Sequence, residues 1–252
     1  MKRFVVLLVA SACTLTLFSQ GKSSTVPSYL SYGLADGKNI IKFNLLGAAV
    51  RNYAFYGERM LSRKVSFILS CNFMPRGGVP YLENFTDDES LKTLEVGTFS
   101  FTPEMRFYLA SGYGGGFYIG PYYRFERFSL YRLSATFDTE DEEHTIDLDG
   151  SLKTHNGGIV LGCQWLVGPR KNIVLDWSIL GIHGGNSSGN FNGVTDESIS
   201  AEDQSEIKED IEDALDIPII KSEVSVDEHS AHVKIKGPWA FIRGSFSIGY
   251  RF

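Results

Sequence analysis

Apolar and polar side chains alternate along much of the chain, and the clearest case is its last segment, Trp239–Phe252. One face carries Ile242, Phe246, Ile248, Tyr250 and Phe252, and the other carries Arg243, Ser245, Ser247, Gly249 and Arg251. Only an extended strand places every second side chain on the same side. A final strand with such an apolar face is typical of a transmembrane β-barrel, in which Phe246, Ile248, Tyr250 and Phe252 would face lipid.

Seven earlier segments show the same period of two, so the pattern predicts eight strands. They are Ile40–Ala48, Asn52–Met60, Val65–Phe73, Thr98–Leu109, Phe117–Arg132, Gly158–Val167 and Ile173–Gly181. Most are long enough to cross a bilayer when tilted, and eight is an even number that closes a barrel of this kind. The phase slips near Arg127, which indicates a bulge or the rim of the barrel.

The connections between these strands, after the first, alternate between short and long. If both termini are periplasmic, the long connections are extracellular, as in outer-membrane barrels. The longest is the acidic segment 182–238, which we expect to be an extracellular loop. Within it, Ser198–Asp216 has apolar residues at near-helical spacing, and Ser200 with Asp203 forms a capping box. We therefore predict a short amphipathic helix that lies over the barrel mouth or on the loops.

The start of the chain predicts a secretory signal peptide. Met1-Lys2-Arg3 is basic, Phe4–Ala10 is apolar, and small and polar residues follow. We expect a signal peptide at 1–20, a periplasmic segment at 21–38 and the barrel at 39–252. The alternative is a lipoprotein signal in which Cys13 is lipidated. After the signal no apolar run is long enough for a membrane-spanning helix.

Charge and cysteine content narrow the alternatives. The formal net charge of −6 argues against nucleic acid as a partner. The two cysteines beyond the signal, Cys71 and Cys163, are predicted on outward faces of strands that are not neighbours. We therefore expect no structural disulfide.

The inward faces of the predicted strands carry charged residues of both signs. They are Lys42, Glu58, Glu104, Arg106, Arg124, Glu126, Asp176, Arg243 and Arg251. An eight-stranded barrel is just wide enough for side chains to fill it, and buried charges need partners. We interpret these residues as an ion-pair network that fills the interior; the alternatives are a conducting lumen and a buried catalytic cluster.

Other chemistry has weaker support. Asp138–Asp149 is acidic but lacks the spacing of a calcium loop, and His229 with His232 is the best candidate for a metal site. Asp176, Ser178 and His183 could serve an enzyme, yet an interior face must be polar in any case. The glycines at 112–116 fit a flexible periplasmic turn. We expect no metal site, no cofactor and no enzymatic activity.

Four segments, Asn39–Gly47, Thr102–Leu109, Gly116–Arg124 and Asp176–Gly185, together with the closing strand, resemble a known family. It is an outer-membrane β-barrel family of Bacteroidota-type Gram-negative bacteria that is named as a domain of unknown function. The similarity covers about residues 38 to 252. It implies an outer-membrane barrel without an assigned activity and offers no catalytic residues to carry over.

The sequence thus predicts an all-β protein, an eight-stranded antiparallel up-and-down transmembrane β-barrel with long extracellular loops and a short loop helix. We expect an integral protein of the cell outer membrane with a structural or surface-interaction role, such as adhesion, envelope integrity or ligand capture. The alternatives are a narrow channel for small solutes and a barrel-embedded enzyme that modifies lipid or peptide. Expected partners are outer-membrane lipid, the barrel-assembly machinery and an extracellular ligand, but not nucleic acid.

Overall fold

The computed structural model describes residues 37–252 except 79–93, 111–112, 139–142, 196–197 and 216–218. The predicted signal peptide at 1–20 and nearly all of the segment 21–38 lie outside the described residues. Residues 36–252 form one compact unit, which is described by itself below.

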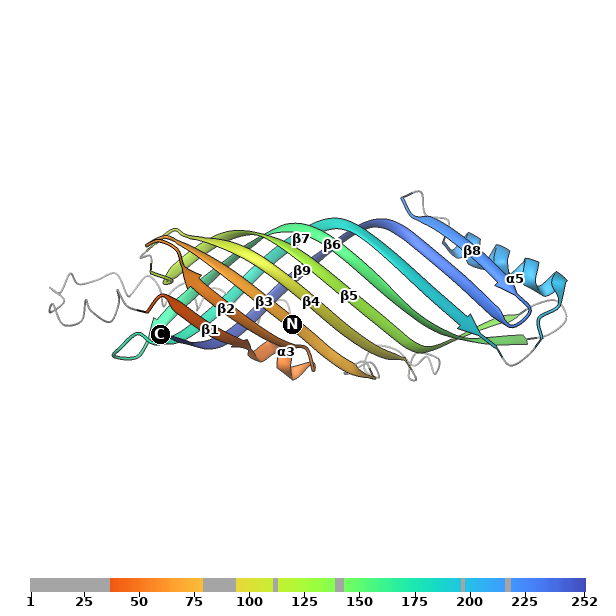
Figure 1. The fold of residues 1–252 in the computed structure, drawn as a ribbon, viewed down its shortest axis with the longest axis horizontal. Helices are drawn as coiled ribbons and strands as arrows, with labels where there is room; N and C mark the ends of the chain where they lie inside the picture. The colour runs from red at the N-terminus through yellow and green to blue at the C-terminus, as the bar shows by residue number, and fades with distance from the viewer. Residues whose placement is uncertain (1–36, 79–93, 111–112, 139–142, 196–197, 216–218) are drawn as a thin grey trace, which may run out of the picture. The chain divides into compact units, whose positions relative to one another are not determined.

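This unit is built almost entirely of β-strands (Figure 1). The strands are β1 (Asn39–Asn44), β2 (Tyr53–Met60), β3 (Val65–Gly78), β4 (Glu95–Tyr108), β5 (Gly116–Asp138), β6 (Glu143–Val167), β7 (Ile173–Val194), β8 (Lys221–Asp227) and β9 (Ser230–Arg251). The helices are α3 (Leu45–Ala49) and α5 (Ala201–Ala214). The predicted all-β class is therefore confirmed.

Eight of the described strands form a closed antiparallel ring. Each strand from β1 to β6 pairs with the next one, β7 pairs with β9, and β9 pairs with β1. The closing pair aligns Ile40 with Arg251 and Asn44 with Ser247, so the last strand closes the ring against the first. β8 lies outside the ring and pairs with the first part of β9. We call the end where Asn39 pairs with Phe252 the terminal end, and the opposite end the extended end.

Side chains alternate between the two faces of the ring, except at register shifts in β3, β5 and β7. Each ring strand contributes a large apolar side chain that is exposed on the outward face, for example Ile41, Phe55, Phe67, Phe99, Phe117, Ile159, Ile182 and Ile248. The inward positions between them are mostly polar and buried. This arrangement is the reverse of a soluble core, because the apolar surface faces out. No helix among the described residues has both the length and the apolar character needed to span a membrane.

The first predicted strand is shorter than expected. It ends at Asn44, and Leu45–Ala49 forms α3 instead of continuing the strand. Asn44 caps this helix, because its side chain accepts a hydrogen bond from the Gly47 backbone amide at 3.2 Å. Leucine and alanine favour helix, so the segment follows its local propensity once the cap is in place.

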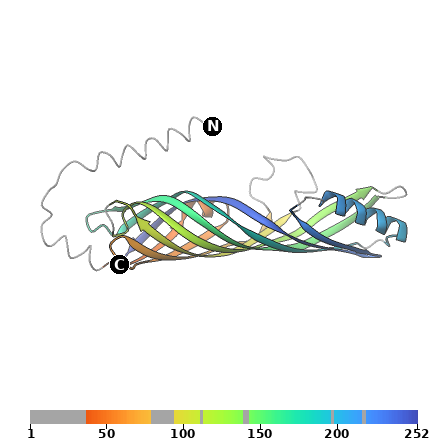
Figure 2. The same cartoon turned by 90° about the horizontal axis from the view of Figure 1, so that it is seen from above.

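The wall of the ring opposite β1 and β2 is longer than expected. β5, β6, β7 and β9 continue well past β1 and β2 at the extended end (Figures 1 and 2). The segment 182–238, expected as a loop, contains the second half of β7, α5, β8 and the start of β9. The irregularity expected near Arg127 lies instead between Leu130 and Leu133, where Arg132 has a φ of 56°.

The predicted helix of the acidic segment is confirmed as α5. Ser200 caps it and accepts from the Asp203 backbone amide, and the Ser200 hydroxyl also donates to the Asp203 carboxylate at 2.7 Å. One side of the helix region packs on the extended strands, where Ile199 and Ile207 are buried against Ala231. Figures 1 and 2 show α5 beside the extended ends of the strands.

The two cysteines lie on β3 and β6, which do not pair with each other. Cys71 is exposed, as an outward side chain should be. Cys163 also has an outward register, but it is 2% exposed. Its low exposure is explained by its cross-strand neighbours Phe117 and Trp177, whose side chains are much larger than that of cysteine.

Candidate functional site

The interior of the ring contains a dense group of charged and polar side chains near the terminal end. Lys42 on β1 is its centre: the ammonium nitrogen lies 2.8 Å from Glu58 Oε2 and 2.6 Å from Asp176 Oδ2. It also donates to Gln164 Oε1 at 2.9 Å. Three donors of one ammonium group are therefore matched by three acceptors from three different strands.

Arg106 on β4 joins the same group. Its guanidinium donates to Glu104 Oε1 at 2.5 Å and to Asp176 Oδ2 at 2.7 Å. Glu104 in turn pairs with Arg243 on β9. We call Lys42, Glu58, Glu104, Arg106, Gln164 and Asp176 the plug.

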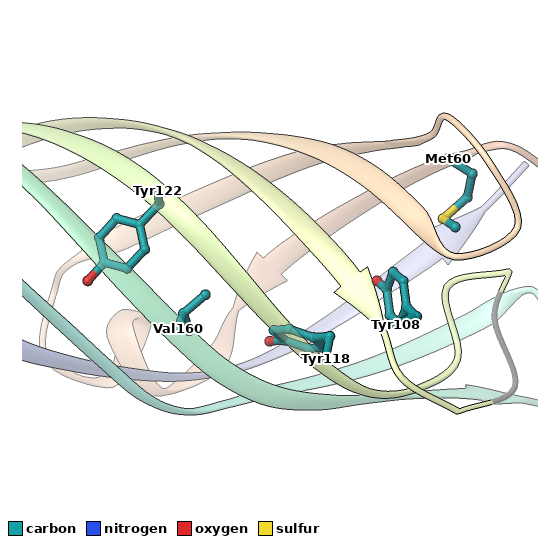
Figure 3. Packing of buried hydrophobic residues seen from close by; sticks show 5 residues of the cluster. All are labelled: Met60, Tyr108, Tyr118, Tyr122 and Val160. Atoms are coloured by element: carbon teal, nitrogen blue, oxygen red, sulfur yellow. The ribbon is translucent and has the colours of Figure 1, made fainter.

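Tyrosines and a turn complete the plug at the terminal end. Tyr108 donates to Glu58 Oε1 at 2.5 Å, and Tyr118 donates to Asp176 Oδ1 at 2.9 Å. Gln164 donates to the carbonyl oxygen of Gly114 at 2.7 Å, so the turn between β4 and β5 is held against the interior. Figure 3 shows Tyr108 and Tyr118 with Met60 and Val160 inside the ring, where they form an apolar layer.

The charges of the plug are balanced. With Arg243 included, three cations (Lys42, Arg106, Arg243) face three carboxylates (Glu58, Glu104, Asp176). All six plug residues are 3% exposed or less. In such an environment the removal of one partner leaves an uncompensated buried charge, so the members stabilise one another as a set.

A second group of inward side chains lies toward the extended end and is bonded less completely. His183 Nδ1 and the Tyr122 hydroxyl are 3.0 Å apart, and His183 Nε2 is 3.8 Å from Glu126 Oε2. Glu126 accepts from Arg124 at 2.6 Å, and Arg124 also donates to Thr102 Oγ1 at 3.1 Å. The guanidinium of Arg243 lies 4.0 Å over the Tyr122 ring and connects this group to the plug.

Aromatic rings line the interior beside these polar groups. The ring centroids of His183 and Phe241 are 6.4 Å apart, and those of Phe241 and Trp239 are also 6.4 Å apart. Trp239 is in turn 5.6 Å from Phe128 across the ring. We call Tyr122, Phe128, His183, Trp239 and Phe241 the aromatic cluster.

The sequence prediction missed most of this cluster, although a signal for it was present. Phe241 and Trp239 continue the same alternation that places Arg243 inward, and Phe128 shares its phase with Arg124 and Glu126. The alternation of apolar and polar residues breaks near Arg127 because Phe128 faces inward, whereas the register shift itself lies between Leu130 and Leu133.

Several buried polar atoms near the aromatic cluster have no hydrogen-bond partner among the described residues. They are Arg124 Nε, Arg243 Nε, His183 Nε2, Trp239 Nε1, Asn156 Oδ1 and Ser100 Oγ. Leaving such groups unbonded costs about 1–3 kcal/mol each. Incompletely bonded polar groups beside exposed aromatic faces are a common property of ligand sites, and the plug has no equivalent.

The nine predicted interior charges therefore do not form one network. Five of them belong to the plug, and a sixth, Arg243, pairs with the plug residue Glu104. Arg124 pairs with Glu126 nearer the extended end. Arg251 lies at the terminal end, where its guanidinium donates to the carbonyl oxygen of Gly37. The sixth member of the plug, Gln164, was not among the predicted residues, because a neutral amide carries no charge signal.

The residues considered for an enzyme do not assemble as a nucleophile and base. Asp176 is occupied by Lys42, Arg106 and Tyr118, and Ser178 contacts the Tyr118 hydroxyl at 3.0 Å. His183 contacts Tyr122 and Glu126 instead.

The two candidate metal ligands, His229 and His232, contact different side chains. His232 Nδ1 is 2.8 Å from Asn192 Oδ1, whereas His229 is near Glu228. Within the described ranges, no three His, Cys, Asp or Glu side chains come together to hold a metal ion. Part of the acidic stretch Asp138–Asp149, at 139–142, lies outside the described residues.

An exposed ion pair marks the rim at the extended ends of β3 and β4. Arg76 donates to Glu95, and its guanidinium lies 4.2 Å over the ring of Tyr131. The hydrogen bond from Arg76 lowers the pKa of the Glu95 carboxyl below its ordinary value of 4.5.

Comparison with known families places the chain. Residues 8–185 match the model of a family described as protein of unknown function (DUF3575), and the match spans most of the chain. The chain belongs to this family. The match ends within β7, so α5, β8 and β9 lie beyond it, whereas the resemblance was expected to reach residue 252. No curated protein matches the chain.

Proposed function

We propose that this protein is an integral outer-membrane β-barrel with a sealed lumen, and that it acts at its extended end by binding a partner or ligand outside the cell. The observation that carries the proposal is the inversion of the ring: apolar side chains face out and a balanced ionic plug fills the inside. Water-soluble proteins rarely expose a continuous apolar belt, whereas a bilayer requires one.

The closed backbone supports a membrane location. In hydrocarbon every backbone amide and carbonyl needs a partner from the protein, and a closed ring of strands provides it. The ring satisfies this requirement at the level of the plug, where β1 and β9 pair, but not along 237–246 of β9, which lacks a strand partner on one side among the described residues. The exposed Ile248, Tyr250 and Phe252 of the final strand would then contact outer-membrane lipid.

The plug argues against a channel for small solutes. Its charged groups are bonded to one another, and Tyr108, Tyr118 and Met60 lie beneath them. An ion would have to break several buried ion pairs to pass, which is costly in an interior of low dielectric.

The extended end favours a binding role. The parts of β7 and β9 that continue past β1 and β2 carry exposed polar side chains on their outward face, and α5 adds an acidic surface with Glu202, Glu206 and Glu209. This part of the unit has a small apolar core of its own around Ile199 and Ile207, so it is a folded platform. We also propose that the protein comes from a Gram-negative bacterium of the Bacteroidota type and that the barrel-assembly machinery inserts it into the outer membrane.

The lumen is tested by conductance. Full-length protein without its predicted signal peptide, folded in detergent, should give no single-channel current in planar bilayers. A double variant with Lys42→Ala and Asp176→Ala, if it folds, should conduct, because it removes the centre of the plug. Steady wild-type current would contradict the sealed-lumen proposal.

The binding role is tested by removing the platform. Val194 pairs with Ser230, and the Thr195 amide donates to the carbonyl of His229 at 3.1 Å. Residues 195–229 can therefore be replaced by an Asn-Gly turn, which joins antiparallel strands tightly. We expect the variant to fold and to insert into vesicles but to lose adhesion of expressing cells to host or bacterial surfaces. If such adhesion is unchanged, the binding role of this segment is wrong.

A further inference from the structure

One edge of β9 lacks a strand partner over much of its length. On one side β9 pairs with β7 almost throughout. On the other side β1 pairs with Ser247–Arg251 and β8 pairs with Ser230–Lys236. Among the described residues, no strand pairs with the stretch between them, 237–246, on that side. The cause is the early end of β1, which turns into α3 at Leu45.

Apolar side chains surround this open edge on the outward face. α3 contacts β9, and its Leu45 and Leu46 are 43% and 57% exposed. Ile242 of β9 is 65% exposed and pairs with Ile182, which belongs to the outward apolar belt. The edge therefore begins within the belt and does not lie wholly above it.

The inward face beside the same edge is apolar and accessible as well. Phe241 points inward by its register with His183, yet it is 61% exposed. Phe241 and Ile242 are neighbours in sequence on opposite faces of one strand. Exposed apolar side chains therefore stand on both faces of a strand edge that no strand covers among the described residues.

Polar side chains of the interior lie behind this edge. Arg243, His183 and Trp239 each have a buried side-chain nitrogen without a hydrogen-bond partner among the described residues. The guanidinium of Arg243 is already tied to Glu104 and stacked on Tyr122, so the group is held in place. Exposed apolar side chains on both faces of an unpaired strand edge are complementary to the hydrocarbon chain of an amphiphile.

From these features we infer that the open edge of β9 is a lateral site that admits the acyl chain of a membrane lipid into the aromatic cluster. The inference rests on the proposed membrane location. A second polypeptide strand is a poorer occupant, because Pro238 has no amide to donate and α3 already contacts the strand. Lipid is also the solvent that the adjacent belt would meet.

Tryptophan fluorescence tests the site, because bromine atoms on lipid chains quench an indole at contact. The chain has three tryptophans, of which Trp165 and Trp177 face outward and Trp239 faces inward. The variant Trp165→Phe/Trp177→Phe leaves Trp239 as the reporter in the otherwise complete protein. In vesicles of dibrominated phosphatidylcholine, compared with dioleoyl phosphatidylcholine, Trp239 should lose as large a fraction of its emission as Trp177 does in the matched variant Trp165→Phe/Trp239→Phe.

A third reporter measures quenching through a closed wall. Tyr118 faces inward on β5, which is paired on both sides there. Tyr118→Trp in a protein without other tryptophans should be quenched clearly less than Trp239. In the Trp239 reporter, Phe241→Gln should lower quenching, since it removes an exposed apolar side chain from the open edge, while the same change leaves Trp177 quenching unaltered.

The outcomes separate the two proposals. If Trp177 is quenched but Trp239 is quenched no more than the Tyr118→Trp reporter, the lateral site is wrong and the membrane location stands. If neither Trp177 nor Trp239 is quenched in correctly folded protein, the outward belt does not meet lipid and both proposals fail.

Discussion

Asp176 and His183 face the same interior from the same strand, yet they lie in contrasting environments. Asp176, in the plug, accepts from Lys42, Arg106 and Tyr118 at 2.6–2.9 Å. His183, toward the extended end, has one hydrogen-bond contact, with Tyr122, and an unbonded Nε2 among the described residues. The difference shows that the plug residues use their bonding capacity on one another, whereas His183 keeps an unbonded nitrogen beside aromatic rings.

The wall of the ring shows the same division. At the terminal end the wall is continuous, because β1 closes against β9. Toward the extended end β1 and β2 stop, and the edge of β3 beyond Phe73 and the edge of β9 at 237–246 are left without strand partners among the described residues. The half with the complete plug is therefore also the half with the complete wall, and the accessible Phe241 lies where the wall is interrupted.

The largest expected effect is the loss of Asp176. Asp176→Ala leaves Lys42 and Arg106 buried without their shared carboxylate, which should lower the free energy of unfolding by about 3–5 kcal/mol. Urea unfolding in lipid vesicles, followed by circular dichroism, measures it. Asn190→Ala, at an exposed position of the same strand, is the matched control and should change stability little. Equal effects of the two variants would contradict the role of the plug.

A much smaller effect is expected at His183. His183→Phe removes one hydrogen bond to Tyr122 but keeps the ring beside Phe241, and it also removes an unbonded buried nitrogen. These contributions oppose each other, so the change should stay within about 1 kcal/mol. The same urea experiment measures the change. If His183→Phe lowers the free energy of unfolding as much as Asp176→Ala does, the two halves of the interior do not differ in their contribution to stability.

The sequence predicted the ring strands well, because alternation with a period of two is a local property of each strand. The same pattern was ambiguous at Leu45–Ala49, where leucine and alanine suit a helix as well as a strand. Past the apolar belt the alternation becomes too weak to recognise, since a stretch such as Ser187–Asn192 has a single large apolar side chain, Phe191, and resembles a loop. Strand lengths at the extended end could not be predicted for this reason.

The interior contacts were harder to predict than the interior residues. Lys42 and Asp176 are 134 positions apart, and their contact depends on how the whole ring closes. Alternation identified both as inward but could not say that they meet, or that Arg124 and Glu126 lie outside the plug. The inward aromatic residues were predictable from the phase of Arg243, but large apolar side chains on a barrel strand are expected to face lipid.

A moderate effect is expected where the wall of the extended half is interrupted. Arg51, with a φ of 63°, donates to the carbonyl oxygens of Pro75, Arg76 and Gly78 on the free edge of β3. Arg51→Ala should cost about 1 kcal/mol and speed amide hydrogen exchange in that part of β3, because the edge loses its donors. Arg51→Lys keeps the charge but not the fork of donors, so exchange should also accelerate. If exchange in both variants matches wild type, the arginine does not protect this edge.

The smallest expected effect is at the rim pair of Arg76 and Glu95. The pKa of Glu95 is lowered in the folded protein, so the pair contributes stability above the ordinary value of 4.5 and loses it as the pH falls through the lowered pKa. Both side chains are solvent-accessible, and the contribution should be small and weakened by salt. The unfolding midpoints of wild type and Glu95→Gln should therefore differ slightly at neutral pH and converge under acid. The plug should be insensitive to the same salt, because its ion pairs are buried; a plug variant whose effect fades with salt would show that water reaches the terminal half of the interior.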